Sequence, residues 1–376
     1  MKRIIYIGMD VHSTSFTLCA LEVRIGDDDR VIANIKVEAD YRNVLKFIDG
    51  LKEKVGKRTT FICGYEAGCL GYTLQRQLSA ANVDCKILAP TTMKVERGGK
   101  RIKTDKRDAK DIAQNLAYKS CSFVHIPTEE EQDIRDYLRL RDDHVRELKR
   151  IKQEINAYVL SHGHKYEGKS KWTIAHMKWL KGLPLSDVQK EILNEYLTTY
   201  EQLTDKIASF DERIEKFAAD EKYQEKVKAL SCLLGIKTYG AMTALVETGD
   251  FGRFATANKY TAYLGLVPGE HTSDESVNRL SITKAGNRHM RRVLTEAAQA
   301  ICKGQPGHKS IALRQRQKGN SPEIIAYADR ANERMRRKYY RMIFKGKKRN
   351  VAVTAIAREL ACFIWGIMTD NLERAV

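Results

Sequence analysis

The feature that most constrains this chain is a short run of β-forming residues close to its start. Ile4 to Ile7 lead through Gly8 and Met9 into Asp10, and this run has the pattern of a strand that is buried on both faces. Such strands lie inside sheets that helices cover on both sides. Functional side chains gather at the carboxyl ends of these strands, so Asp10 is a candidate site residue.

The first third of the chain continues as an alternation of strands and helices. Residues 15–23 form the next expected strand and follow at once, which predicts an antiparallel hairpin. The other elements expected before residue 120 are strands at 30–37, 60–65 and 83–88 and helices at 43–54, 71–81 and about 105–118. Three strands in meander order, followed by strands that alternate with helices, is the order of the ribonuclease H-like fold. A generic doubly wound sheet is the alternative.

Four acidic residues mark a candidate metal site. Asp10 and Glu66 each end a buried strand, and Asp105 and Asp108 begin the helix that follows a basic segment. Residues three apart lie on one side of a helix, so the last two can point together. Four converging carboxylates would suit two Mg²⁺ ions, which need oxygen ligands and can assist substitution at phosphorus. Each acid taken singly also fits a structural role, and Asp111 fits the helix surface.

The middle of the chain is strongly helical and charged. Residues 129–160 read as one helix, and residues 187–217 carry apolar side chains in alternating steps of four and three over about three heptads. The pattern predicts an antiparallel or partnered coiled-coil arm with its aromatic residues in the core. The segment 161–171 holds His162 and His164, and a flexible basic loop fits it better than a metal site.

The last third is also mostly helical, with one polar interruption. The expected helices lie at 258–264, 288–302, 322–344 and 351–368. Residues 269–281 are expected to form a flexible loop that carries Ser273 and Ser276 before a basic helix. A serine needs a base, a lowered pKa or a metal to act as a nucleophile, and no GxSxG motif is present. The residues alone therefore give these serines no role.

The charge of the chain favours polyanionic partners. Lys and Arg number 66 against 48 acidic residues, which gives a net charge of +18. The bases cluster at 94–107 and 334–349, where Tyr339 and Tyr340 lie among them, a combination that suits phosphates and stacked bases. A solvated basic helix face is the alternative. The scattered cysteines indicate reduced thiols of a cytosolic protein, and we expect no signal peptide and no apolar run of membrane-spanning length.

Several motifs together resemble a known family of transposases. GMDVHS contains Asp10, YEAGCLGY contains Glu66, and KTDKRDAKDIA contains Asp105 and Asp108. These motifs are similar to the DEDD signature of insertion-sequence transposases. In the second half, LLGIKTYGAMTAL, FGRFATANKYTAYLGLVPGEHTS and ITKAGNRHMRRVLTEAA resemble the C-terminal domain of the insertion-sequence one-hundred-and-ten family. The blocks stand in the expected order and cover most of the chain.

The resemblance implies a division into three parts and a metal cofactor. Residues 1–125 would be a RuvC-like domain with a Mg²⁺-binding DEDD site for two ions. Residues 126–225 would be the helical coiled-coil arm, and residues 226–376 a helical C-terminal transposase domain. The fold class is thus α/β plus mostly α.

The resemblance also implies a catalytic serine and several partners. The serine forms a covalent phosphoserine link to DNA, and by position it is Ser273, with Ser276 and then Thr272 as alternatives because Asp274 stands where the family usually has glycine. Family members are guided by a structured bridge RNA that pairs with donor and target DNA. They assemble as oligomers, here expected as a dimer or tetramer, in which the DEDD site of one subunit meets the serine of another.

These observations predict a DNA transposase and recombinase of the bacterial cytoplasm, associated with the nucleoid. Two rival functions stay open. One is a RuvC-like endonuclease that hydrolyses DNA junctions with a metal-activated water and needs no serine. The other is a non-catalytic scaffold that binds nucleic acid through its basic helices and its arm.

Overall fold

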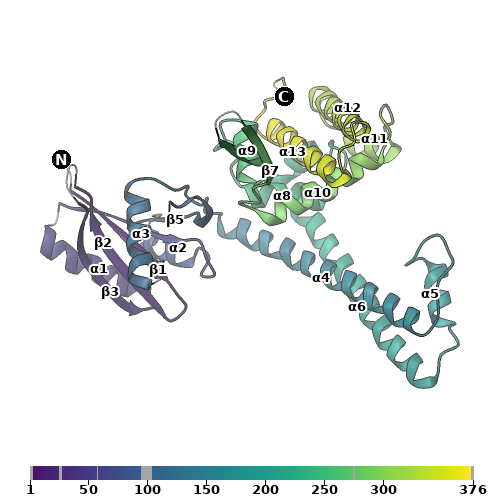
Figure 1. The fold of residues 1–376 in the computed structure, drawn as a ribbon, viewed down its shortest axis with the longest axis horizontal. Helices are drawn as coiled ribbons and strands as arrows, with labels where there is room; N and C mark the ends of the chain where they lie inside the picture. Colours follow the sequence, from purple (N-terminus) through teal and green to yellow (C-terminus); the bar gives the residue numbers. More distant parts are fainter. Residues whose placement is uncertain (1–2, 25–27, 57, 95–103, 274–275, 374–376) are drawn as a thin grey trace. The chain divides into compact units, whose positions relative to one another are not determined.

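The computed structural model divides the chain into two compact units, which are described separately. Unit 1 is Met1–Ile126 and unit 2 is Pro127–Val376. Described are all residues except 1–2, 25–27, 57, 95–103, 274–275 and 374–376 (Figure 1). Between 271 and 279 the description covers the strand backbone and not the side chains.

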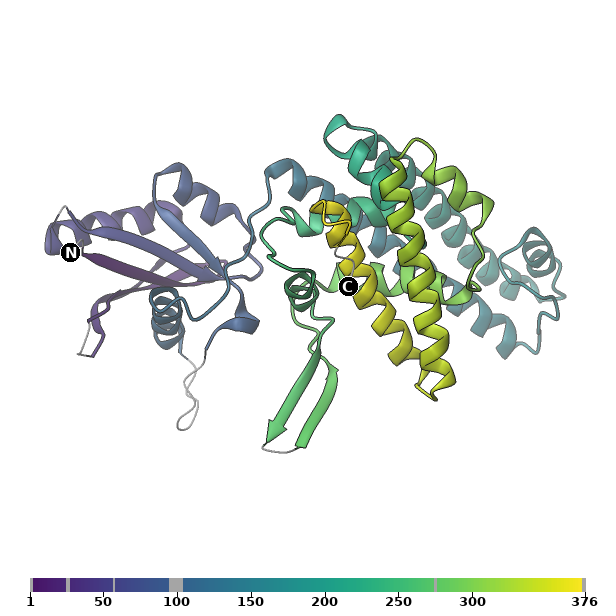
Figure 2. The ribbon, with the colours of Figure 1, turned by 90° about the horizontal axis from the view of Figure 1, so that it is seen from above.

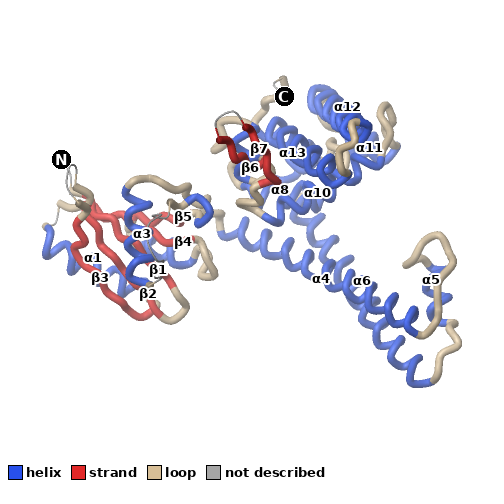
Figure 3. The backbone as a smooth tube through the Cα atoms, viewed as in Figure 1, coloured by secondary structure: helices blue, strands red, loops and turns tan. Residues whose placement is uncertain are grey.

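Unit 1 is built on a mixed sheet of five strands in the order β3-β2-β1-β4-β5. The strands are β1 (Ile4–Val11), β2 (Ser15–Glu22), β3 (Arg30–Glu38), β4 (Thr60–Glu66) and β5 (Asp84–Leu88). The first three pair antiparallel, and β1, β4 and β5 pair parallel (Figure 3). The predicted mixed α/β domain is therefore confirmed, and its strand order is consistent with a ribonuclease H-like fold.

Helices cover both faces of this sheet because its central strands are apolar on both sides. The helices are α1 (Tyr41–Val55), α2 (Thr73–Ala80) and α3 (Asp105–Ala117), with a 3₁₀ turn, η1, at Pro90–Thr92. On one face Ile7 and Met9 join a core that includes Val44 of α1 and Leu78 of α2. On the other face Leu116 of α3 belongs to a smaller cluster. Successive strand residues alternate between the two faces, so even-numbered residues of β1 face α3.

A glycine in β1 sets how closely α3 approaches the sheet. A Cβ atom at Gly8 would lie 2.0 Å from the carbonyl oxygen of Ala109 and 2.4 Å from the amide nitrogen of Ala113. Gly64 lies beside Gly8 in the parallel ladder, and a Cβ there would lie 2.8 Å from Leu88 Cδ1. Helix α3 packs against the sheet at these two glycines. The first turn of the helix thereby comes to the end of β1.

The first part of unit 2 is an antiparallel pair of long helices. They are α4 (Glu129–Ser161) and α6 (Asp187–Ala218), and α5 (Ile174–Lys181) lies at their far end (Figure 1). The ring of Tyr137 lies 5.4 Å from that of Phe210, and the ring of Tyr158 lies 5.9 Å from that of Tyr196. The chain directions of the two helices are therefore opposite, as predicted. Supercoiling of the pair stays a prediction.

The second part of unit 2 is a helical body. Its elements are α7 (Glu221–Leu230), α8 (Thr238–Thr248), α9 (Ala257–Tyr263), β6 (Pro268–Ser273), β7 (Ser276–Ile282), α10 (Arg288–Lys303), α11 (Ile311–Gln317), α12 (Pro322–Phe344) and α13 (Arg349–Met368). Contrary to expectation, α13 is long and apolar enough to cross a membrane by length and composition. Most of that stretch is buried inside the protein, where Leu360 and Phe363 join the core. Core packing accounts for its composition.

Residues 268–273 and 276–282 form two paired strands, where the sequence predicted a flexible loop over 269–281. Strands β6 and β7 pair antiparallel, with Ser273 opposite Ser276 at the tip (Figure 2). Their polar composition suggested a loop, but the ladder satisfies the backbone groups whatever the side chains are. At the base of the hairpin Arg291 Nη1 donates to the carbonyl oxygens of Leu264, Ala285 and Gly286. The base is thus fixed to the helical body, and Figure 2 shows the strands extending away from the helices of unit 2.

Candidate active site

Two of the predicted acids end neighbouring strands of the sheet in unit 1. The parallel register pairs Met9 with Tyr65, so Asp10 and Glu66 follow at adjacent positions. Each stands two residues beyond a glycine that faces α3, and strand alternation places both acids on that same face. Asp10 is partly buried and Glu66 is exposed.

The other two predicted acids lie in the first turn of α3. The Thr104 side chain caps this helix and accepts a hydrogen bond from the backbone of Arg107. Burial raises the pKa of Asp10 and His12 lowers it, while the negative charges of Asp105 and Asp108 raise it further. The two helix acids are therefore close enough to act on Asp10. The net direction is upward, because burial and the two neighbouring carboxylates outweigh the effect of His12.

One residue that the sequence argument did not single out belongs to this group. His12 Nε2 lies 3.3 Å from Asp10 Oδ2. Among the described residues, the ligand atoms of Asp10, His12 and Asp105 all lie within 4.8 Å of one another. Glu66 and Asp108 are not part of that tight group. The DVH spacing was visible in the sequence, but an exposed histidine in a turn carries no signal of its own.

A lysine from the edge strand β3 also reaches the site. Asp10 pairs with Thr17 of β2, and Thr17 pairs with Lys36 of β3, so the three lie in one row across the strands. Lys36 Nζ donates to Asp105 Oδ2 at 2.9 Å, and this contact holds the pKa of that carboxyl below its usual range. Thr17 is 1 % exposed, and its Oγ1 has no hydrogen-bond partner in the described part of the chain.

The donor set at this edge of the sheet fits a divalent cation. Carboxylate oxygens are the ligands that Mg²⁺ and Mn²⁺ take in proteins. The raised pKa of Asp10 and the buried, unpaired hydroxyl of Thr17 both indicate a site whose polar groups the protein itself does not satisfy. The remaining candidate, Asp111, is half-buried further along α3.

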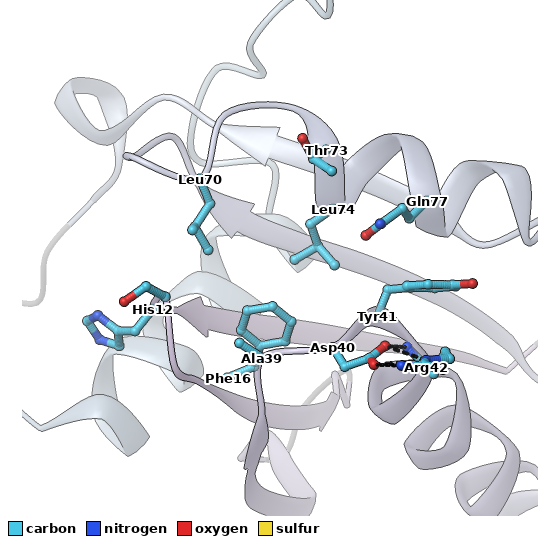
Figure 4. A pocket seen from close by; sticks show the side chains of 11 residues that line it. His12, Phe16, Ala39, Asp40, Tyr41, Arg42, Leu70, Thr73, Leu74 and Gln77 are labelled. Carbon is cyan, nitrogen blue, oxygen red and sulfur yellow. Dashed lines mark hydrogen bonds and ion pairs between the residues drawn. The ribbon is translucent and has the colours of Figure 1, made fainter.

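A groove of about 560 Å³ lies beside this site but on the other face of the sheet. Figure 4 shows Phe16, Tyr41 and Leu74 around it, with Asp40 bound to Arg42 at one end. These side chains belong to the α1 and α2 side. The groove is therefore not the carboxylate site, although His12 lines its edge.

The predicted serines lie in unit 2, at the tip of the hairpin. Ser273 ends β6 and Ser276 begins β7, and the two oppose one another in the ladder. Their side chains lie outside the described atoms. His162 and His164 do not take part in a described group of three or more potential metal ligands. His162 Nδ1 instead lies 2.9 Å from the carbonyl oxygen of Tyr158.

On α12 fewer bases are available at the surface than the sequence suggested. Most of the predicted segment 94–107 lies outside the described residues. On α12, Arg334 and Lys338 both bind the buried carboxylate of Glu359, and Arg336 is buried. Those three bases therefore have structural roles. The exposed bases at the turn between α12 and α13 are Arg341, Lys345, Lys347, Lys348 and Arg349.

Comparison with known proteins assigns both units. A family model for the DEDD transposase domain of IS110 elements matches residues 7–163, and the model described as transposase IS116/IS110/IS902 family matches residues 227–311. A putative transposase of Sinorhizobium fredii is 32 % identical over 97 % of this chain and 88 % of its own length. The transposase for insertion sequence element IS1533 of Leptospira borgpetersenii is 31 % identical over 93 % of this chain and 99 % of its own length. The transposase for element IS1111A of Coxiella burnetii is 25 % identical over 84 % of this chain.

Proposed function

The chain belongs to the IS110 family of transposases, enzymes that cut and rejoin DNA, and from that premise we propose how its two units divide the chemistry. Unit 1 holds the metal-dependent cutting site, formed by Asp10, Glu66, Asp105 and Asp108. One observation carries this proposal. Acids from two strands and one helix, up to 98 residues apart in the sequence, gather on the α3 face at the end of β1.

The carboxylates of unit 1 would bind and orient the scissile phosphate through divalent cations. We expect two Mg²⁺ ions, and bound there they would neutralise charge on the phosphate. Asp10 would be the central ligand, because its side chain is 18 % exposed against 44 % for Asp105 and it ends the strand between Glu66 and the row that leads to Lys36. Glu66 is exposed on the adjacent strand end, which suits a ligand that faces the substrate. Lys36 occupies Asp105 until a cation takes its place.

The serine of unit 2 would be the nucleophile, with Ser273 first and Ser276 as the alternative. Its oxygen would form a bond to phosphorus while the bond to a deoxyribose oxygen breaks, and the released sugar oxygen takes up a proton. Attack by a hydroxyl of the partner strand reverses the step, so the phosphodiester energy is kept. No nucleoside triphosphate is needed. The hairpin supports this role because it carries the serine away from the helical body on a fixed base.

The proposed partners are donor and target DNA, a structured bridge RNA and further copies of the chain. The net charge of +18 supports binding to polyanions. The exposed turn between α12 and α13 is the described basic surface that suits this role best. The RNA and an oligomer are implied by the family resemblance of the motifs.

A denaturing gel tests the proposal on the full chain with Mg²⁺, donor DNA and RNA transcribed from the DNA that flanks the gene. Wild type should give DNA that is covalently attached to protein. Ser273→Ala and Asp10→Asn should each abolish that product, while Ser281→Ala, a control in the same hairpin, should keep it.

The rival functions predict different results in the same assay. Free DNA ends without attached protein, at full rate in Ser273→Ala and Ser276→Ala, would indicate a RuvC-like endonuclease that uses water. Wild type that binds the DNA and RNA without cutting DNA, with binding unchanged in Asp10→Asn, would indicate a scaffold. If the product is lost in Ser276→Ala and kept in Ser273→Ala, the nucleophile is Ser276 and not Ser273.

A further inference from the structure

His12 stands in the turn that joins β1 to β2, at the mouth of the carboxylate site. Its backbone N–H donates to the carbonyl oxygen of Ser15 at 3.0 Å and closes the turn. Its Nε2 lies 3.3 Å from Asp10 Oδ2. Figure 4 shows the imidazole ring turned away from Phe16 and Leu74, which line the neighbouring groove. The ring therefore points toward the carboxylates and not into the groove.

Three potential ligand atoms lie close enough together for a single ion to reach them after a small adjustment. The ligand atoms of Asp10, His12 and Asp105 lie within 4.8 Å of one another. Two ligands in neighbouring positions of an octahedron, each about 2.1 Å from the ion, stand about 3 Å apart. The separation of 3.3 Å between His12 and Asp10 is close to that value. The His12 side chain is 56 % exposed, so packing does not oppose a small adjustment.

We propose that His12 is a direct ligand of the divalent cation, which makes the site one of mixed nitrogen and oxygen donors. The proposal rests on the carboxylate metal site described under the proposed function and adds a fifth residue to it. Imidazole nitrogen favours first-row transition metals, whereas Mg²⁺ prefers oxygen ligands alone. The site therefore binds Mn²⁺ more tightly than Mg²⁺, and His12 supplies a large part of that difference.

The competing role for His12 is a hydrogen bond to Asp10 without contact to the metal. Loss of activity in a His12 variant would fit both roles, because each orients Asp10. Only direct coordination couples the electron spin of the ion strongly to an imidazole nitrogen. A spectroscopic measurement on the bound metal therefore separates the two roles.

Pulsed electron paramagnetic resonance on the full chain gives that measurement, with Mn²⁺ as the sole metal and kept below one equivalent. Wild type should show modulation from a directly bound ¹⁴N nucleus, and labelling all histidines with ¹⁵N should change it to the ¹⁵N pattern. His12→Gln should lose the modulation and still bind Mn²⁺. Ser13→Ala, a control in the same turn, should keep it.

Titration calorimetry adds the affinity. His12→Gln should weaken Mn²⁺ binding by roughly tenfold, with a smaller loss for Mg²⁺. Wild type that binds Mn²⁺ without nitrogen modulation, or modulation that persists in His12→Gln, would overturn the role of His12 and leave the carboxylate site standing. Wild type that binds no Mn²⁺, or binds it as well after Asp10→Asn, would overturn the metal site itself.

Discussion

Two carboxylates, one in each unit, have pKa values that are shifted in opposite directions. In unit 1 the side chain of Asp10 is 18 % exposed, and burial together with Asp105 and Asp108 raises its pKa. In unit 2 the side chain of Glu247 is only 2 % exposed, yet its pKa is lowered. The more deeply buried acid is therefore the one whose charged form is stabilised by its surroundings.

The difference lies in what surrounds Glu247. Burial alone would raise the pKa of Glu247, but hydrogen bonds from Arg139 and Asn287 and the charge of Arg135 outweigh it. Arg139 binds both carboxylate oxygens, at 2.8 and 3.0 Å, and Asn287 Nδ2 donates at 2.5 Å. Asn287 is also the N-cap of α10, just beyond the serine hairpin. This cluster joins α4, α8 and α10.

The comparison separates structural charge from functional charge. A buried acid that is paired with cationic side chains of the same protein contributes to folding stability. Breaking the pair would leave a buried charge without compensation. An acid whose surroundings disfavour its charged form is a candidate for binding a ligand that would stabilise that form. By this criterion Glu247 stabilises unit 2, and the Asp10 group is the candidate binding site.

The largest effect is expected from Asp10→Asn, which tests the functional half of the comparison. Loss of the central ligand should cost about 4 kcal/mol of transition-state stabilisation, or roughly a thousandfold in DNA cleavage. Thermal unfolding of the metal-free variant should occur at the same temperature or higher, since the substitution removes a disfavoured charge. A clear fall in unfolding temperature with intact cleavage would assign Asp10 to the structure instead.

Glu247→Gln tests the structural half. Removing the charge takes away the carboxylate that Arg139 and Arg135 share, and we expect the free energy of unfolding to fall by about 3–5 kcal/mol. Urea titration measures this change. Glu201→Gln is the control, because Glu201 pairs with Lys181 at the exposed end of the arm and should cost at most about 1 kcal/mol. Equal losses in both variants would remove the distinction drawn above.

Gly8→Ala tests how the carboxylates are brought together. The added Cβ would collide with the backbone of α3, so unit 1 should lose about 2–3 kcal/mol of stability. Because α3 carries Asp105, Mn²⁺ binding should weaken as well. Gly50→Ala is the control. It lies inside α1 with open space around its Cβ position, and it should gain about 0.5–1 kcal/mol.

The features that could be predicted were those that depend on residues close together in the sequence. Strand runs and helix starts located Asp10, Glu66 and the first turn of α3, because strand burial and capping depend on neighbours in sequence. The hairpin 268–282 was missed because its strands are polar, and strand pairing can stabilise polar segments that periodicity does not mark. The order of the elements predicted a ribonuclease H-like domain, with which the observed sheet order is consistent.

The rest could not be predicted because it depends on tertiary contacts. Gly8 looked like one more strand glycine until α3 lay on it. Lys36 reaches Asp105 across 69 residues of sequence, and Arg139 reaches Glu247 across 108. In the basic run 334–349, Lys338 pairs with a buried acid, which the sequence did not indicate, while the bases from Arg341 onward are exposed. A cluster of charged residues in a sequence does not reveal which of them form ion pairs inside the folded protein.

Acidification should distinguish wild type from Glu247→Gln. The lowered pKa of Glu247 means that its contribution is fully present above the pKa of an unfolded glutamate, about 4.3. The contribution is lost as pH falls through the lower folded value. The difference in unfolding free energy between the two proteins should therefore be constant near pH 7 and shrink below about pH 4. Urea titrations at pH 7 and in acid measure it, and a gap that widens in acid would contradict the lowered pKa.

The smallest expected effect comes from Lys36→Met, which makes the Asp10 group still less compensated. Lys36 pairs with Asp105 in a partly exposed position, so the pair is worth at most about 1 kcal/mol. If the ammonium only holds the place of a cation, its removal should raise Mn²⁺ affinity by up to roughly fivefold. Lys86→Met removes the same charge from β5, where Lys86 binds Asp84, and should leave the affinity nearly unchanged. Calorimetry that shows weaker binding in Lys36→Met alone would mean that this lysine positions Asp105 for the metal rather than competing with it.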